Sequence, residues 1–251
     1  MLSVIIIAKN EALNIRRCLE SVRWANEIIV LDSGSTDETV EIAKAYTSHV
    51  YLTDWQGYGV QKQRALNYTT QEWVLNLDAD ESVSDALKKD IQRMIQDNKV
   101  DACRIPIQMH FEGKPLHHSS SPSRHARLFK RKGAHFSHDI VHEKIVLPDG
   151  AVIAQLNTSI LHHSFRDVSH AIEKMNRYSS YSAKMRRDAA KKPSLTRTLL
   201  SSSWMFFRCY FLQCGFMDGK IGLLFSCLNA QCAFFRGVKQ LYPDKNQERL
   251  M

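Results

Sequence analysis

Two aspartates separated by one residue, Asp78 and Asp80, follow the apolar segment 73–77. If that segment is a strand, side chains two residues apart point to the same side, and the two carboxylates lie close together. Paired carboxylates can hold a divalent cation whose remaining positions take phosphate oxygens. We therefore expect Mg²⁺ or Mn²⁺ here, although this spacing alone fits a pair of solvated loop acids equally well.

Polar residues also follow two earlier strand-like segments. The apolar run 3–8 is rich in β-branched residues and is followed by Asn10 and Glu11. Residues 28–31 form a second such run, followed by Asp32. Runs of this kind are typical of strands buried on both faces of a parallel sheet. Because ligands of open α/β sheets collect outside the carboxyl ends of the strands, we expect these residues and the two aspartates to share one edge.

Helical patterns alternate with these strands over the first hundred residues, which predicts an α/β fold with a mostly parallel sheet flanked by helices. A third short strand is expected at residues 50–52. Ser35, with Glu38 three residues later, predicts a capping box at the start of one helix. Ser84 is expected to cap another.

The pattern changes after residue 101. Short strands predicted at residues 102–107, 127–129 and 160–163 indicate an antiparallel extension, and a Ser/His/Pro-rich stretch at 116–124 indicates a mobile loop. Residues 165–208 carry 10 Lys/Arg and 3 Asp/Glu, and the interrupted apolar stretches 199–217 and 221–235 end the pattern. We interpret this part as a basic helical linker followed by a helical hairpin.

Composition narrows the class of protein. The chain has 251 residues and a formal net charge of +8, and its 44% hydrophobic content excludes a disordered or fibrous protein. Residues 1–100 carry 11 Lys/Arg and 15 Asp/Glu, whereas the rest carry 23 and 11, so the two parts should face different partners. Six cysteines without a C-x-x-C pair and a first segment that soon turns polar predict free thiols in a reducing cytoplasm. The late apolar stretches are interrupted by polar residues, so a spanning helix is not expected.

Three segments in order, SVIIIAKNE at 3–11, DSGSTDET at 32–39 and LNLDADE at 75–81, resemble the inverting glycosyltransferases of family 2, which have the GT-A fold. The later segments RLFKR at 127–131 and LHHSFRD at 161–167, with Val141-His142-Glu143, are similar to the bacterial branch that builds the lipopolysaccharide inner core, the core β-1,4-glucosyltransferases.

The resemblance implies a role for each residue of the expected edge. Asn10 and Glu11 would lie beside the nucleotide, Asp32 would contact the uracil, and Asp78 would lie near the ribose. Asp80 would bind the metal. Arg64 matches a basic residue of the donor pocket.

The resemblance also implies a general base and a histidine ligand. In the family the base lies in a motif that commonly ends Glu-Asp, and here the matching position is Glu143 followed by Lys144, so the second acid is absent. Glu143 is therefore the predicted base and Asp139 the reserve. His162 is the predicted second metal ligand, with His163 one position away.

These implications combine into one expected function. The chain would be a metal-dependent inverting hexosyltransferase that moves glucose from UDP-glucose to a heptose of the lipopolysaccharide core. Residues 1–165 would form the GT-A catalytic domain, with a nucleotide-sugar half at 1–100 and an acceptor half at 101–165. Residues 166–251 would hold the basic linker and amphipathic helices that associate with an anionic membrane surface on the cytoplasmic, inner face of the inner membrane.

Other readings remain at this point. The helical segment 166–251 could instead form a dimer interface, and a nucleic-acid partner is not expected. The acidic residues of the expected edge would also fit a transferase that uses another nucleotide sugar or a polyprenyl-phosphate acceptor. They would fit a non-catalytic protein that binds sugar nucleotides as well. His138 and His142, four residues apart, suggest a zinc site, but the H-E-x-x-H order is missing. Gly57-Tyr58-Gly59 lacks the third glycine of a dinucleotide fingerprint, so NAD is excluded.

Overall fold

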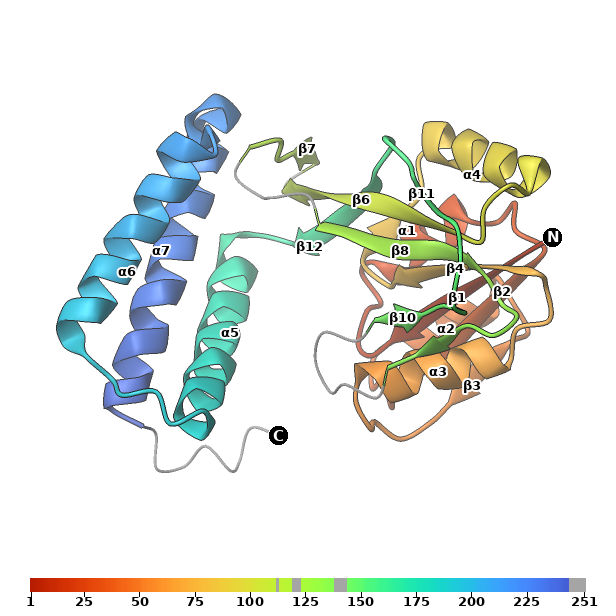
Figure 1. Ribbon diagram of the computed structural model, residues 1–251. Helices are drawn as coiled ribbons and strands as arrows, with labels where there is room; N and C mark the ends of the chain where they lie inside the picture. The colour runs from red at the N-terminus through yellow and green to blue at the C-terminus, as the bar shows by residue number, and fades with distance from the viewer. Residues whose placement is uncertain (112, 119–122, 138–143, 244–251) are drawn as a thin grey trace. The chain divides into compact units, whose positions relative to one another are not determined.

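The computed structural model describes residues 1–111, 113–118, 123–137 and 144–243, with the backbone alone for Ser123 and Arg124. The chain divides into two compact units (Figure 1). The sheet unit comprises residues 1–108 and 122–164, and the helical unit comprises residues 109–121 and 165–251. The division into catalytic and membrane-associating parts at residue 165 stays a prediction.

One mixed sheet, in the strand order β3-β2-β1-β4-β8-β6-β12-β5, forms the frame of the sheet unit. Its first half is parallel and consists of β1 (Leu2–Ala8), β2 (Glu27–Asp32), β3 (Val50–Leu52) and β4 (Trp73–Asp78). The antiparallel partners that follow include β8 (Ser123–Lys130), β6 (Ala102–Phe111), β12 (Ile160–Phe165) and β5 (Glu81–Ser82). Short strands β7 (Lys114–Pro115) and β11 (Ile153–Gln155) pair with β6, and β9 (His135–Phe136) pairs with β10 (Ile145–Val146).

Strand β1 shows why this sheet forms. All seven of its residues are buried, and the apolar ones alternate between two apolar clusters. Val4 and Ile6 pack with residues of α1 (Ile15–Ser21), α2 (Thr39–Lys44) and α4 (Asp85–Asp97). Ile5 and Ile7 pack with residues of α3 (Tyr58–Asn67). A strand covered on both faces needs a continuous apolar run, which is the pattern the sequence shows.

One of the two predicted helix caps is correct. Ser84 caps α4, because its side chain accepts a hydrogen bond from the Leu87 N–H. The capping box at Ser35 is wrong: α2 begins at Thr39, and Glu38 precedes it without a side-chain cap. The Ser35 hydroxyl donates to Asp32 Oδ2 at 2.5 Å instead, so the serine organises the loop before the helix.

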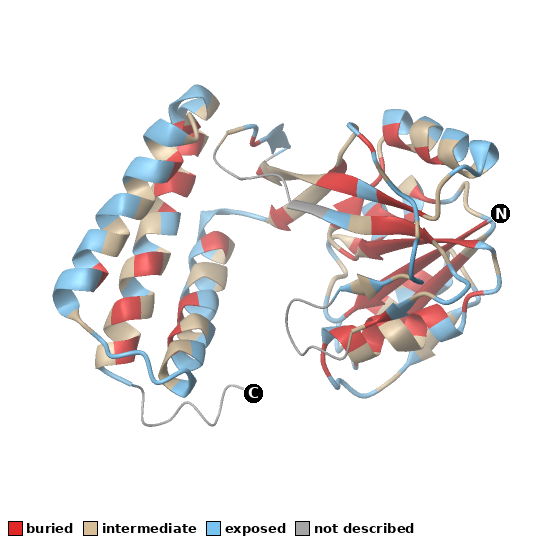
Figure 2. Cartoon of the chain, in the orientation of Figure 1, coloured by how far each residue is buried: buried red, intermediate tan, exposed pale blue. Residues whose placement is uncertain are grey.

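Three long helices make up most of the helical unit: α5 (Val168–Asp188), α6 (Leu195–Phe207) and α7 (Gly219–Leu241). A π-helical segment (Arg208–Leu212) and a 3-10 turn (Gly215–Asp218) connect α6 to α7. Helix α7 packs against both α5 and α6, so the expected hairpin is present and the basic segment before it is a third helix of the same bundle. Figure 2 shows that many positions on α6 are exposed.

Two glycines allow close helix contacts. A Cβ at Gly237 would lie 2.1 Å from Thr198 Oγ1, and one at Gly222 would lie 1.8 Å from the Gly215 carbonyl oxygen. Within the described residues, Gly215–Leu241 is long enough to cross a membrane and contains an 18-residue window with a mean hydropathy of 1.3. The core helix of a helical bundle passes the same test.

Candidate functional site

The loop after β1 is tied to the loop after β2 by reciprocal hydrogen bonds. Asn10 has a φ of +56°, a conformation that asparagine tolerates better than most residues. Its N–H donates to Ser35 Oγ and its Oδ1 accepts from the Thr36 N–H, both at 2.8 Å. The Glu11 N–H donates to Thr39 Oγ1 at 2.8 Å. The predicted nucleotide residues Asn10 and Glu11 therefore lie beside the Asp32 loop, as expected for one sheet edge.

Asp32 is fully buried at the end of β2. Its Oδ1 accepts from the Gly34 N–H at 2.9 Å and from the Ser35 N–H at 2.8 Å, so it shapes the turn. Asp32, with Thr53 and Asp54 after β3, also lines a cavity of about 530 Å³. This size is within the range of small-molecule sites.

Helix α3 closes the same region from its inner face. The buried Gln61 amide donates to Ser33 Oγ at 2.7 Å and to Thr53 Oγ1 at 3.0 Å. Arg64, one turn later, donates to the Asp54 carboxylate at 2.9 Å. Arg64 therefore forms an ion pair with an aspartate that lines the cavity. This is the edge of the sheet where the resemblance places the donor pocket.

Two cations hold Asp78 at the end of β4. Lys62 Nζ lies 3.1 Å from Asp78 Oδ1, and Arg127 Nη2 lies 3.2 Å from Oδ2. Partial burial by itself would raise the pKa of Asp78, but these two cations outweigh it and hold the pKa well below its usual range. Asp78 is therefore an ionised carboxylate.

The buried Glu81 shares Arg127 with Asp78. Arg127 Nη2 lies 2.8 Å from Glu81 Oε1, and the Asp78 N–H donates to Glu81 Oε2 at 2.9 Å. Burial raises the pKa of Glu81 against the attraction of Arg127, and the charge of Asp78 raises it further. Glu81 therefore holds the backbone of Asp78, and Arg127 holds its side chain.

Sequence reasoning assigned no role to Lys62, Arg127 or Glu81. A signal was available for Lys62: it occupies the inner face of α3 with Gln61, Ala65 and Leu66, and a lysine on such a face needs a buried acid. Arg127 lies 49 residues from Asp78 in the chain, and only the pairing of β8 with β4 brings it there.

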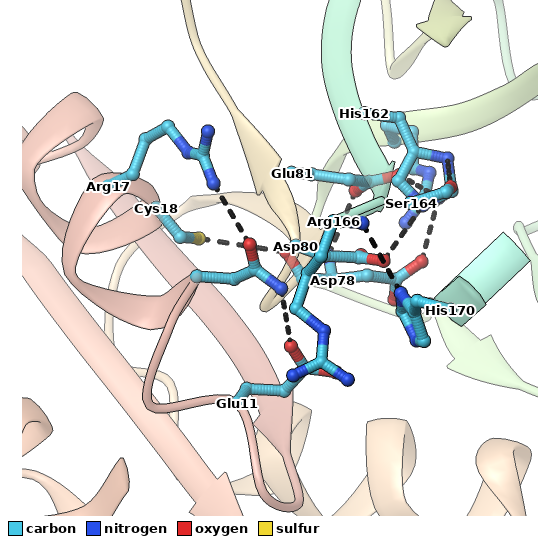
Figure 3. A network of polar contacts seen from close by, with 12 residues as sticks. Glu11, Arg17, Cys18, Asp78, Asp80, Glu81, His162, Ser164, Arg166 and His170 are labelled. Atoms are coloured by element: carbon cyan, nitrogen blue, oxygen red, sulfur yellow. Dashed lines mark hydrogen bonds and ion pairs between the residues drawn. The ribbon is translucent and has the colours of Figure 1, made fainter. Parts of the chain in front are cut away.

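Asp80 faces a different partner from Asp78. His162 Nε2 lies 3.1 Å from Asp80 Oδ2 (Figure 3). Ser164 Oγ, two residues along β12, lies 2.7 Å from His162 Nε2. Burial by itself would lower the pKa of His162, but the hydrogen bond and charge of Asp80 raise it. The structure thus brings together the two residues expected at the metal.

The neighbouring His163 points to the other side of β12. Its N–H donates to the Asp80 carbonyl oxygen at 2.9 Å, and its ring nitrogen lies 3.3 Å from Ser82 Oγ. Successive side chains of a strand alternate, so only one of the two histidines can reach the Asp80 carboxylate. In this structure that histidine is His162.

The donor chemistry of Asp80 and His162 fits a divalent cation. Among the residues that the structure describes, no group of three histidine, cysteine or acidic side chains could hold a metal. A cation here would have one carboxylate and one imidazole ligand and would take its others from phosphate oxygens or water, as Mg²⁺ and Mn²⁺ do. Glu143 and Asp139, the candidate bases, lie outside the described residues, as do His138 and His142.

Comparison with known proteins decides the family. The sequence model described as glycosyl transferase family 2 matches residues 3–147, more than half of the chain. The chain belongs to glycosyltransferase family 2.

Relatives match nearly the whole chain. A glycosyltransferase of Rickettsia bellii is 32% identical over 250 residues, covering 95% of this chain and 85% of that one. The lipopolysaccharide core biosynthesis glycosyltransferase LpsC of Rhizobium meliloti is 29% identical over 262 residues, covering 97% and 95%. The structure is also similar to a mannosyltransferase of Pyrobaculum calidifontis solved with GDP-Man and Mn²⁺, with a TM-score of 0.53 and 16% identity, covering 97% of this chain and 88% of that one. The predicted GT-A fold is confirmed.

Proposed function

We propose that this family 2 glycosyltransferase transfers glucose from UDP-glucose to a heptose of the lipopolysaccharide inner core, with inversion. The observation that carries the proposal is the polar edge itself: Asp80 faces His162 next to an ionised Asp78, at the same sheet edge as a cavity lined by Asp32. The relative LpsC, matched over nearly its whole length, supports the lipopolysaccharide acceptor.

The nucleotide would bind across the loops after β1 and β2. In the proposal Asn10 and Glu11 lie beside it and Asp32 contacts the uracil from the turn that it shapes. Asp78 would meet the ribose with an ionised carboxylate, held in place by Lys62 and Arg127. Arg64 would supply positive charge to the donor pocket by exchanging part of its contact with Asp54.

Asp80 and His162 would hold Mg²⁺ or Mn²⁺. The bound ion supplies charge neutralisation to the departing nucleoside diphosphate, which is a Lewis-acid role. Ser164 and the β5–β12 pairing orient the histidine on its strand, and Asp80 lies in the two-residue turn between β4 and β5.

The acceptor hydroxyl is a poor nucleophile at neutral pH, so a positioned carboxylate has to take its proton as the new bond to the anomeric carbon forms. We assign this proton transfer to Glu143, with Asp139 as the reserve. One displacement by that hydroxyl inverts the sugar configuration.

The lipid acceptor implies a membrane surface, and α6 with its π-helical extension offers a face for one. Leu200, Trp204, Phe207 and Phe211 recur at helical spacing and are all exposed. The rings of Phe207 and Phe211 lie 5.3 Å apart, and those of Trp204 and Phe207 6.0 Å apart, which makes a continuous aromatic row. Aromatic side chains flanked by cations are typical of helices that lie on anionic membranes. We therefore place the enzyme peripherally on the cytoplasmic face of the inner membrane.

Two measurements test the function. Purified protein with Mn²⁺ and UDP-glucose should release UDP when heptose-bearing lipid A core is added, and cells lacking the protein should make a core oligosaccharide one hexose lighter. If nucleoside diphosphate is released only from GDP-sugars, the donor is a GDP-sugar and not UDP-glucose. If the sugar is transferred to a polyprenyl phosphate, that lipid and not the heptose is the acceptor. No release from any nucleotide sugar would leave a non-catalytic binding protein.

The base is tested by Glu143→Gln, which should retain UDP-glucose binding and lose about 10²- to 10⁴-fold in transfer. Asp139→Asn is the matched control and should stay active. Full activity of Glu143→Gln would assign the proton transfer to another group.

A further inference from the structure

A polar cavity of about 400 Å³ lies within the helical unit, well separated in the chain from the glycosyl-transfer residues. It lies where the end of α5, the start of α6 and the last turns of α7 meet, at the same end of the bundle (Figure 1). Four cations line it, Arg186, Lys191, Lys192 and Arg197, together with the hydroxyl groups of Ser194 and Ser201. None of the residues that the structure places around it is acidic.

These four cations are distinct from those that hold the bundle together. Arg187 donates to the Lys239 carbonyl oxygen at 2.8 Å, which stabilises the end of α7. Lys239 itself donates to Asn176 Oδ1 at 2.6 Å and to Ser179 Oγ at 2.7 Å. By contrast, within the described part of the chain no ion pair involves any of the four cations around the cavity. Their charges are available to a ligand.

The backbone fixes two of these cations next to a third. Helix α5 ends with Ala190 in the left-handed region, at a φ of +53°, and the Lys191 N–H returns to the Arg186 carbonyl oxygen at 3.0 Å. The Ala190 N–H also donates to the Arg187 carbonyl oxygen, at 2.8 Å. These two hydrogen bonds together form a Schellman motif. The Gln240 side chain then donates to the Lys191 carbonyl oxygen and ties the loop to α7.

The floor of the cavity is equally constrained. Thr198 and Gln240 are buried, and α6 and α7 touch at Thr198 and Gly237, where no side chain larger than hydrogen fits. The positive potential reaches beyond the cavity: burial, and next the charge of Arg186, lower the pKa of Arg236. Cations gathered on a rigid frame repel one another, and a bound anion removes that repulsion.

We infer that this cavity is a binding site for a phosphate monoester or diphosphate group. A multiply charged anion matches four cations better than a carboxylate does, and the two arginines offer planar forks that suit phosphate oxygens. The N-terminus of α6, capped by Ser194, adds its partial positive charge to the same place. The site is formed by residues to which the glycosyl-transfer proposal gives no role.

The phosphate group could belong to a lipid headgroup or to a free compound, and vesicle binding separates the two. Full-length protein is sedimented with phosphatidylcholine vesicles that contain either phosphatidic acid, a monoester, or phosphatidylglycerol, a diester, at matched surface charge. A phosphate site in the protein predicts several-fold tighter binding to the monoester vesicles, and pyrophosphate should compete. Stabilisation of the protein by pyrophosphate without any preference between vesicles would support the same site with a free phosphate compound as its ligand.

Two charge-matched double variants make the test specific. Arg186→Gln with Arg197→Gln should reduce binding to phosphatidic acid vesicles about tenfold and abolish the thermal shift caused by pyrophosphate. Arg177→Gln with Lys184→Gln removes two exposed charges elsewhere on α5 and should change neither. Replacement of the same two arginines by lysine keeps the charge and reports on folding.

Equal losses in both double variants would overturn the inference, because the attraction would then be a general property of a basic helix. Binding of a single-stranded RNA oligonucleotide in preference to both kinds of vesicle would also overturn it. No sugar donor is present in any of these experiments, so their outcome is independent of the transferase reaction.

Discussion

In the sheet unit, Asp78 pairs with Lys62 and Arg127, and Glu81 pairs with the same Arg127, at 2.8–3.2 Å. In the helical unit, four cations around a cavity have no acidic partner in an ion pair within the described residues. The first arrangement neutralises its own charge and fixes the shape of a site. The second leaves a positive potential for something outside the chain. The net charge of +8 is therefore not distributed uniformly: the sheet unit uses these charges for positioning, and we expect the helical unit to use its excess for attraction.

The largest effect is expected at the acid of the sheet unit whose partner is a histidine. Asp80→Asn removes the negative charge beside His162 and should lower metal-dependent UDP release about 10²- to 10³-fold, as loss of one charge-stabilising group commonly does. The measurement is UDP release across a Mn²⁺ titration, and EDTA should abolish release by the unchanged protein.

Matched variants sharpen this test. Asp97→Asn, at the exposed end of α4, should have no effect on release. His162→Ala should raise the Mn²⁺ concentration needed for half-maximal activity more than His163→Ala does, because only His162 lies on the Asp80 carboxylate. Equal effects of the two histidines would argue against His162 as the ligand.

A second variant tests whether the paired charges of the sheet unit are structural. Arg127 is 6% exposed and bridges Asp78 and Glu81, so Arg127→Met leaves a buried carboxylate without its cation. We expect a loss of about 3 kcal/mol in the free energy of unfolding, measured by urea denaturation. Arg131→Met, an exposed position just after β8, should change it by less than about 0.5 kcal/mol. Similar losses in both variants would mean that the buried pairs do not persist in solution.

Local segments of this site could be predicted from the sequence, but their partners could not. The strands of the parallel half were predicted within one residue at each end, because a strand buried on both faces must be continuously apolar. The antiparallel half was predicted too short: β6 extends to Phe111 and β8 begins at Ser123. There the limits depend on pairing between distant strands, which has no local pattern.

The same limit applies to the two aspartates. Their spacing predicted a shared role, yet Asp78 faces cations from α3 and β8 while Asp80 faces a histidine from β12. Each partner comes from a different element and lies between 16 and 82 residues from its aspartate in the chain. Only the fold of the sheet unit brings them together. Ser35 failed as a helix cap for a related reason, because its hydroxyl oxygen accepts the Asn10 N–H from the loop after β1 and its O–H donates to the buried Asp32 carboxylate.

The attraction of the helical unit to membranes should have an apolar component that is separate from its charge. Trp204→Ser with Phe207→Ser removes two exposed rings, 56% and 45% exposed, and should lower partitioning into uncharged phosphatidylcholine vesicles about tenfold. Tyr181→Ser with Met185→Ser, two exposed positions four residues apart on α5, is the matched control and should have little effect. Equal effects would mean that the bundle has no oriented membrane face.

The smallest expected effect distinguishes how each unit accommodates a residue in the left-handed region. Asn10 suits that conformation, and its side chain accepts the Thr36 N–H, so Asn10→Gly should not stabilise the protein. Ala190 has a Cβ that disfavours the same conformation, so Ala190→Gly should raise the free energy of unfolding by about 0.5–1 kcal/mol, seen as a higher denaturation midpoint. Ala189→Gly, at a φ of −80°, should give no gain. A stabilised Ala190→Gly protein that still binds pyrophosphate would show that the turn after α5 places Lys191 and Lys192 by its backbone shape, and that alanine is not needed there for the cavity to form.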